Sequence, residues 1–143
     1  ESPVAHTRDD LPVERWQKLA SPVWMDVRQT YTINNSAVTG IPLAKGMEDE
    51  RHLCPLQLDV IENALFLWSN PGEVVLTPFM GVGSEVYGAV INGRKGIGIE
   101  LKTTYFKQAQ RNMLAAVSGG HGEEMNLDME EIAAVEVGLM DEF

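Results

Sequence analysis

The chain has 143 residues, of which 44% are hydrophobic and 22% charged, as in one ordinary globular domain that buries its own core. No apolar run is long enough for a membrane-spanning helix and no N-terminal signal peptide is recognisable, so we expect a cytoplasmic protein without a membrane partner. The one cysteine, Cys54, excludes an internal disulfide and fits a reducing compartment.

The formal net charge of −10 is unevenly distributed along the chain. Eight of the 21 acidic residues lie within 119–143, which contains no Lys or Arg, so 13 acidic residues accompany all 11 basic ones in the remainder. A nearly neutral body can carry a local basic surface, whereas a uniformly acidic one would repel nucleic acid. Charge therefore neither supports nor excludes binding to DNA.

The first fifty residues are predicted to be irregular, with one short helix and one short strand. In DLPVERWQKLA, Asp10 is a candidate N-cap, and apolar residues follow it at helical spacing. The buried side of this helix is expected to hold Val13, Trp16 and Leu19 or Ala20. Residues 23–27, VWMDV, predict a short strand, and residues 32–50, rich in Asn, Ser, Gly and Pro, predict a surface loop.

Residues 56–117 have a helix–strand–helix–strand–helix pattern. The first helix carries an apolar stripe and ends at Asn70-Pro71-Gly72; the stripe consists of Leu58, Ile61, Leu65 and Trp68. A strand over 74–76, a glycine turn and a helix from Ser84 to about Ile91 follow. We expect the tryptophans to lie in the core, namely Trp16, Trp24 and Trp68.

The second strand, IGIE over 97–100, is predicted to be buried and to end in an acid. Thr103 or Thr104 then caps a last helix, whose buried side is expected to hold Tyr105, Phe106, Ala109, Met113 and Val117. Strands that alternate with helices indicate a parallel, doubly wound α/β sheet. Two strands are too few for a complete sheet of this kind, so the chain is expected to hold only part of one.

The stretch TPFMGVGSE joins the first strand to the helix that follows it. Two glycines at alternate positions, Gly81 and Gly83, can bring backbone N–H groups close to a ligand, although glycines in such turns often serve steric needs alone. Glu100 ends the next strand nineteen positions after Gly81, where an acid can accept hydrogen bonds from ribose hydroxyls. Ligands of open α/β sheets bind at this carboxyl edge, so we expect a site here.

A nicotinamide dinucleotide fits this turn poorly. Its fingerprint, G-x-G-x-x-G, needs a third glycine for close packing of helix and strand, and Val86 occupies that position. A ligand with ribose and adenine but without phosphates fits better. S-adenosylmethionine is the cofactor with those properties.

The stretch TPFMGVGSE resembles the D-P-F-x-G-x-G-T signature of the DNA amino-methyltransferases, which methylate adenine at N6 or cytosine at N4. The resemblance covers residues 51–113, including S-N-P-G-E-V-V before the turn and G-R-K-G-I-G-I-E after it. It implies a Rossmann-like, S-adenosylmethionine-dependent methyltransferase fold. The sequence of residues 52–62, HLCPLQLDVIE, resembles that of phage and prophage members of the family.

The resemblance also implies which residues contact the cofactor. Glu100 matches the ribose-binding acid, Leu101 is placed to touch adenine, and the backbone around His52 and Pro55 approaches the methionine end. Thr77 stands where Asp is usual and Cys54 where Lys is usual, and Asp26 matches a V-W-D-like strand near the pocket. The full set of expected cofactor residues is Asp26, His52, Cys54, Pro55, Thr77, Pro78, Phe79, Gly81, Gly83, Ser84, Glu100 and Leu101.

The family transfers the methyl group at a (D/N/S)-P-P-(Y/F/W) motif, which holds a base flipped out of the duplex. This chain contains no P-P dipeptide, and its nearest match, residues 21–24 (SPVW), lacks the second proline and belongs to the V-W-D-like strand. We therefore expect no catalytic residue in this chain. His6 and His121 have no partners at metal-ligand spacing, so no metal is expected either.

These observations predict three parts: an irregular segment over 1–50, a cofactor-binding core over 51–118 and an acidic tail over 119–143 that cofactor binding does not need. The chain starts without Met, and we expect it to be the C-terminal, cofactor-binding part of a restriction-modification-type DNA methyltransferase. Double-stranded DNA would be bound by the complete enzyme. The open sheet edge would pair with a missing N-terminal half or a second copy. The alternative is a non-catalytic S-adenosylmethionine-binding module or subunit that completes another chain.

Overall fold

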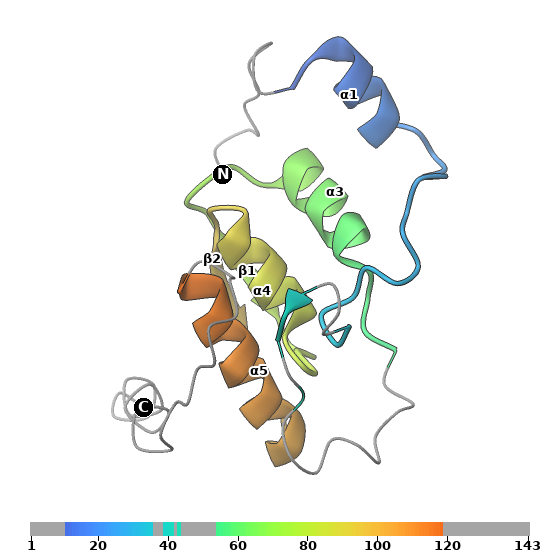
Figure 1. Cartoon of the computed structure of the whole chain (residues 1–143). Coiled ribbons are helices and arrows are strands. Elements are labelled where there is room, and N and C mark those ends of the chain that lie inside the picture. Colours follow the sequence, from blue (N-terminus) through green and yellow to red (C-terminus); the bar gives the residue numbers. More distant parts are fainter. Residues whose placement is uncertain (1–10, 36–38, 42, 44–53, 119–143) are drawn as a thin grey trace.

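The computed structural model describes residues 11–35, 39–41, 43 and 54–118. In chain order, its elements are α1 (Val13–Leu19), α3 (Leu58–Trp68), β1 (Val74–Thr77), α4 (Ser84–Ile91), β2 (Lys95–Gly98) and α5 (Thr103–Val117) (Figure 1). The predicted succession of helices and strands over 56–117 is therefore confirmed. Within this described part, no helix combines the length and apolar character needed to cross a membrane.

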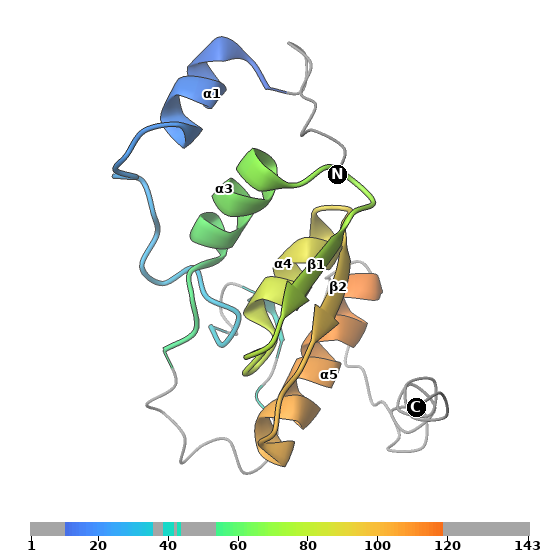
Figure 2. The ribbon, with the colours of Figure 1, turned by 180° about the vertical axis from the view of Figure 1, so that it is seen from behind.

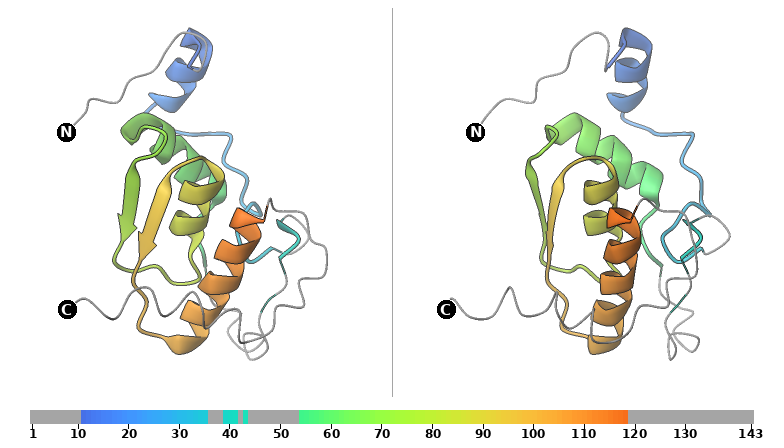
Figure 3. Two further views of the ribbon diagram at one scale, coloured as in Figure 1. Left: turned by 90° about the vertical axis from the view of Figure 1, so that its left-hand side faces the viewer. Right: turned by 60° about the vertical axis from the view of Figure 1, so that its left-hand side comes forward.

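The two strands form a small parallel sheet with helices on one side. Val74 lies opposite Lys95 and Leu76 opposite Ile97. Seen from behind, β1 and β2 lie in front of α4 and α5 (Figure 2), and the side view places both helices on the same face (Figure 3). The opposite face carries side chains that are 50 to 62% exposed, namely Val74, Leu76, Ile97 and Ile99. A doubly wound sheet, with helices on both faces, remains a prediction.

Glycines allow the close approach of α4 and the turn to the covered face of the sheet. A Cβ at Gly98 would lie 2.3 Å from Sδ of Met80, and a Cβ at Gly96 would lie 2.5 Å from Cγ1 of Val86. Real Cβ atoms essentially never show contacts under 3.0 Å. The G-x-G spacing within β2 is therefore a packing requirement of this sheet.

The main core lies between α3 and α4. The predicted stripe on α3 is confirmed for Leu58, Ile61 and Leu65, which are buried, whereas Trp68 is 70% exposed. Gly88 on α4 brings the two helices together, since a Cβ there would lie 2.5 Å from Cγ2 of Ile61. The same cluster also contains Ile33, Ile41, Val82, Tyr87 and Ala89.

A buried arginine closes the C-terminal end of α3. The last carbonyls of a helix lack intrahelical partners, and α3 has no basic residue of its own in its last turn. Arg94, which directly precedes β2, supplies the donors: Nη2 donates to the Ser69 carbonyl at 2.8 Å and Nε donates to Ser69 Oγ at 3.1 Å. Burial lowers the pKa of Arg94 from its usual value.

The N-terminal expectations need correction. Pro12, not Asp10, precedes α1 and gives no side-chain cap, and Asp10 lies outside the described residues. Val13 and Trp16 are exposed, because this two-turn helix buries only its end, at Leu19. Residues 23–27 form no strand, since within the described part the sheet consists of β1 and β2 alone. Trp24 is half-buried.

Residues 28–31 are instead anchored on the first turn of α3. The Arg28 backbone N–H donates to Asp59 Oδ2 at 2.8 Å, and its Nη2 donates to Asp59 Oδ1 at 2.6 Å. The Leu58 N–H donates to the Tyr31 carbonyl at 2.9 Å. The hydrogen bond from Arg28 holds the pKa of Asp59 below its usual value.

Three predictions for the C-terminal half also need correction. The second strand is Lys95–Gly98, two residues earlier than expected and exposed on one face, because pairing with β1 sets its register. Lys102 occupies the N-cap position of α5 without a side-chain cap, so neither threonine caps this helix. Val117 is exposed because the last turn extends past the packed part of α5. The predicted acidic tail, 119–143, lies outside the described residues.

Candidate functional site

The turn between β1 and α4 adopts a conformation that only glycine takes readily. Gly81 has φ 57° and Gly83 has φ 87°, both in the left-handed region. The Gly83 N–H donates to the Met80 carbonyl at 2.9 Å, and the Gly83 carbonyl accepts the Tyr87 N–H at 2.8 Å as α4 begins. Both glycines of the predicted motif are therefore needed for the path of the backbone.

The carboxylate of Glu100 joins this turn to the end of the second strand. Its Oε2 accepts the Gly81 N–H at 2.8 Å, and its Oε1 accepts the Lys102 N–H at 2.8 Å. Backbone pairing continues beyond the strands up to this point, since Met80 N–H donates to the Ile99 carbonyl at 2.9 Å. Two positions nineteen residues apart thus meet at the carboxyl edge of the sheet.

Apolar side chains are exposed on either side of this junction. Phe79 is 88% exposed in the turn, and Leu101, next to Glu100, is 96% exposed. Pro78 is also exposed, whereas Ser84 is buried at the first position of α4. Thr77 is half-buried on the covered face at the end of β1. The edge therefore combines a fixed carboxylate with accessible apolar groups.

The remaining predicted site residues have other surroundings in the described part of the chain. Asp26 pairs with Lys18 of α1, and this hydrogen bond holds its pKa below the usual value. Cys54 is an exposed free thiol, and Pro55 is half-buried just before α3. His52 lies outside the described residues.

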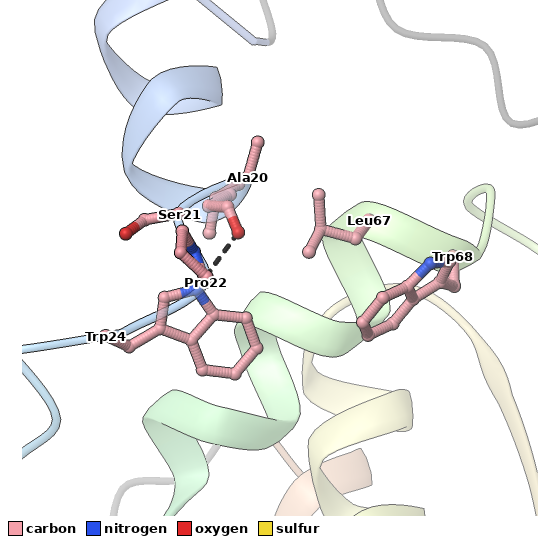
Figure 4. A pocket seen from close by; sticks show the side chains of 7 residues that line it. Ala20, Ser21, Pro22, Trp24, Leu67 and Trp68 are labelled. Atoms are coloured by element: carbon pink, nitrogen blue, oxygen red, sulfur yellow. Dashed lines mark hydrogen bonds between the residues drawn. The ribbon is translucent and has the colours of Figure 1, made fainter.

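A cavity of about 430 Å³ lies elsewhere, between the end of α1 and the end of α3 (Figure 4). Trp24 and Trp68 border it together with Leu67, and the Trp24 indole N–H donates to the Leu19 carbonyl at 3.0 Å. None of the expected cofactor residues lines it. Because α3 ends where the chain turns into β1, this cavity lies toward the amino end of the strands, opposite the edge where ligands of open α/β sheets bind.

Among the described residues, no group of three or more His, Cys, Asp or Glu side chains could hold a metal ion. The segment around Ser21 and Trp24 lies beside the cavity between α1 and α3. Ser21 Oγ donates to the Val23 carbonyl at 2.8 Å, so it is engaged in a local turn.

Two buried polar residues near the turn were missed by sequence reasoning. Gln108 and Asn112 are 1% and 0% exposed, and the Asn112 side chain reaches the Val82 carbonyl. A search for apolar side chains overlooks such residues. Their four-residue spacing places them on one helix face beside Ala109, and this was the feature of the sequence that could have identified them.

Comparison with known proteins gives a family assignment. The family described as DNA methylase, with N6 and N4 specificity, matches residues 4–111. The DNA adenine methyltransferase YhdJ of Escherichia coli (strain K12) is 33% identical over 78 residues, 53% of this chain and 26% of that protein. The orphan methyltransferase M.BamHII of Bacillus amyloliquefaciens is 43% identical over 44 residues, 31% of this chain and 17% of that protein.

The fold is shared with a solved structure. The protein TTHA0409 of Thermus thermophilus, solved in complex with S-adenosyl-L-methionine, matches with a TM-score of 0.57 at 24% identity. The match covers 83% of this chain and 40% of that one. This chain thus spans at most about a quarter of the curated relatives above and less than half of this structure. By the match over residues 4–111, the chain belongs to the family of N6/N4 DNA methylases.

Proposed function

We propose that this chain binds S-adenosylmethionine at the carboxyl edge of the sheet, as the cofactor-binding part of a DNA methyltransferase that acts on an exocyclic amine. The observation that carries this proposal is the contact between Glu100 and the Gly81 N–H at 2.8 Å. It joins the two features that a nucleoside ligand would need, a glycine turn open to its approach and an acid for its ribose.

The residues at this edge suit the parts of such a cofactor. A carboxylate oxygen can accept two hydrogen bonds, so Glu100 can hold the turn and still accept from ribose hydroxyls. Leu101 and Phe79 offer exposed apolar surface for adenine. We assign the methionine end to the segment that contains His52, Cys54 and Pro55, and supporting roles to the remaining members of the expected set, Asp26, Thr77, Pro78, Gly83 and Ser84.

The comparisons support this assignment at the level of the family. One relative is named as a DNA adenine methyltransferase and the other as an orphan methyltransferase, and the protein of similar fold was solved with S-adenosyl-L-methionine. That the same cofactor binds here, at these residues, is our proposal. Placement in a restriction-modification system, a phage or prophage origin and a cytoplasmic location remain predictions.

Calorimetric titration with S-adenosylmethionine, its demethylated product and NAD tests cofactor binding. We expect the first two to bind and NAD not to bind. Glu100→Gln should weaken binding by about 1.5–3 kcal/mol, the range for hydrogen bonds to a charged group. Glu14→Gln on the exposed side of α1 removes the same charge far from the turn and should have no effect. Unchanged affinity in Glu100→Gln would remove that residue from the site.

We further propose that this chain alone transfers no methyl group to DNA, since it contains no P-P dipeptide to hold a flipped base. The measurement is transfer of a tritiated methyl group to mixed-sequence duplex DNA, by this chain and by a longer protein that includes the preceding sequence. Transfer is expected from the longer protein only. Transfer by this chain, abolished by changing Ser21 and Trp24, would make residues 21–24 the catalytic loop.

The uncovered face of the sheet also fits a second candidate, a cofactor-binding subunit that completes another chain. Parallel sheets are normally covered on both faces, whereas Leu76 and Ile97 are exposed here. In the first candidate an N-terminal half of the same protein, or a second copy, would provide the cover. A (D/N/S)-P-P-(Y/F/W) motif encoded upstream of Glu1 would support the first candidate. Cofactor binding without such a motif would support the second.

A further inference from the structure

A buried polar pair on α5 lies behind the glycine turn. Asn112 has no exposed surface, and its Nδ2 donates to the Val82 carbonyl at 2.8 Å. Its Oδ1 accepts a hydrogen bond from Gln108 Nε2 at 2.9 Å. A buried amide side chain is stable only when its donors and acceptors are paired, and Gln108 orients this one so that its N–H₂ group faces the turn.

The Val82 carbonyl and the Gly83 N–H belong to the same planar peptide unit. Asn112 binds the carbonyl, and the Met80 carbonyl binds the N–H at 2.9 Å. Because a peptide unit is rigid, hydrogen bonds at both of its ends fix the orientation of its plane. That plane connects Val82 to Gly83, whose φ of 87° directs the chain into α4.

The same face of α5 also limits the position of the turn by direct contact. A Cβ at Gly83 would lie 3.1 Å from Cβ of Ala109, which is tighter than nine in ten real Cβ contacts. The turn is therefore held by Glu100 at the Gly81 N–H and by α5 at the Val82–Gly83 peptide. Both attachments come from parts of the chain that lie after the glycines in sequence.

We propose that Asn112 is a positioning residue for cofactor binding: it sets the orientation of the Val82–Gly83 peptide so that the turn is shaped before the cofactor arrives. This inference rests on the proposed binding of S-adenosylmethionine at the turn. Preorganisation lowers the ordering penalty of binding, so loss of the Asn112 contact weakens affinity beyond any loss of stability. A purely structural Asn112 would affect stability alone.

The test compares three variants of the full chain at low temperature, where circular dichroism shows each to be folded. Asn112→Leu removes the contact at similar volume, Gln108→Leu keeps Asn112 but removes the group that orients it, and Leu65→Ala opens a cavity between α3 and α4, away from the turn. We expect Kd for S-adenosylmethionine to rise about ten-fold, about three-fold and less than two-fold, respectively. Exchange of the Gly83 amide proton in the cofactor-free chain should accelerate most in Asn112→Leu.

Two results would overturn the proposal: Asn112→Leu with a Kd within two-fold of the unmodified chain, or Leu65→Ala with an equal loss of affinity. If Asn112→Leu does not fold, Gln108→Leu is compared with Leu65→Ala instead. The proposal is then overturned if the Kd of Gln108→Leu stays within two-fold of the unmodified chain, or if Leu65→Ala loses as much affinity. Failure of the unmodified chain to bind S-adenosylmethionine would refute the proposed function instead. The exchange rate of the Gly83 amide, measured without cofactor, then still shows whether Asn112 holds the turn.

Discussion

The two faces of the small sheet differ in the size of the side chains that they accommodate. On the covered face, Gly96 and Gly98 leave room for Val86 and Met80, and a Cβ at either position would require those side chains to shift. On the open face, Ile97 lies between these glycines in β2 and pairs with Leu76 of β1, and both side chains are half-exposed or more. On one face of β2, the packed helices determine which residues fit. On the other face, exposed apolar side chains leave room for a partner to cover them.

The largest effect is expected from Gly98→Val on the covered face. Its side chain would overlap Met80 and Val86, so we expect unfolding to become easier by about 3 kcal/mol, the upper end of the usual range for overpacking. Urea unfolding followed by circular dichroism measures this. Ile97→Val, one residue away on the open face, is the control and should change stability little. Equal stability of the two variants would mean that the covered face can repack.

A second effect is expected where the covered side reaches the turn, at Gly83→Ala. Both the positive φ and the contact with Ala109 oppose a side chain, so we expect a loss of about 2 kcal/mol. Gly72→Ala is the matched control, because Gly72 also has a positive φ, 82°, but nothing lies within 4 Å of a Cβ there. It should lose about 1 kcal/mol. If the two losses are the same, close packing on α5 has no energetic consequence.

A smaller effect, away from both faces, is expected from Asp59→Asn. The pKa of Asp59 is held below its usual value by Arg28, so the pair stabilises the fold above about pH 3.9, and that stabilisation is lost as the pH falls through the lowered pKa. The variant should therefore be slightly less stable at pH 7 and equal to the unmodified chain in acid. Thermal unfolding across pH, with Glu14→Gln as the control, measures this. A difference that grows on acidification would contradict the assignment.

The smallest effect on stability is expected on the open face, from Leu76→Thr. Since Leu76 is 62% exposed, we expect a change of about 0.5 kcal/mol or less. If a second copy of the chain covers this face, the same variant should shift the protein from dimer to monomer in size-exclusion chromatography with light scattering. A large loss of stability without a change in association would show that the face is already covered within one chain.

Local pattern was sufficient for the order of helices and strands over 56–117 and for the glycine turn. The stripe Leu58, Ile61 and Leu65 predicted α3, because helical periodicity depends only on neighbouring residues. The tight turn at Gly81 and Gly83 followed from the same kind of local preference, and the structure adds that both glycines are left-handed. The placing of Glu100 near that turn followed from a general rule about the carboxyl edges of parallel sheets.

Only the tertiary structure decided which side chains are buried and which groups meet. Trp68 and Val117 fit their helical stripes but are exposed, whereas Asn112 is buried although it is polar. Burial depends on the partner that packs against a helix, and the Asn112 contact spans thirty residues of sequence. The register of β2 likewise depends on β1, because a strand has no hydrogen-bond partners of its own until it pairs.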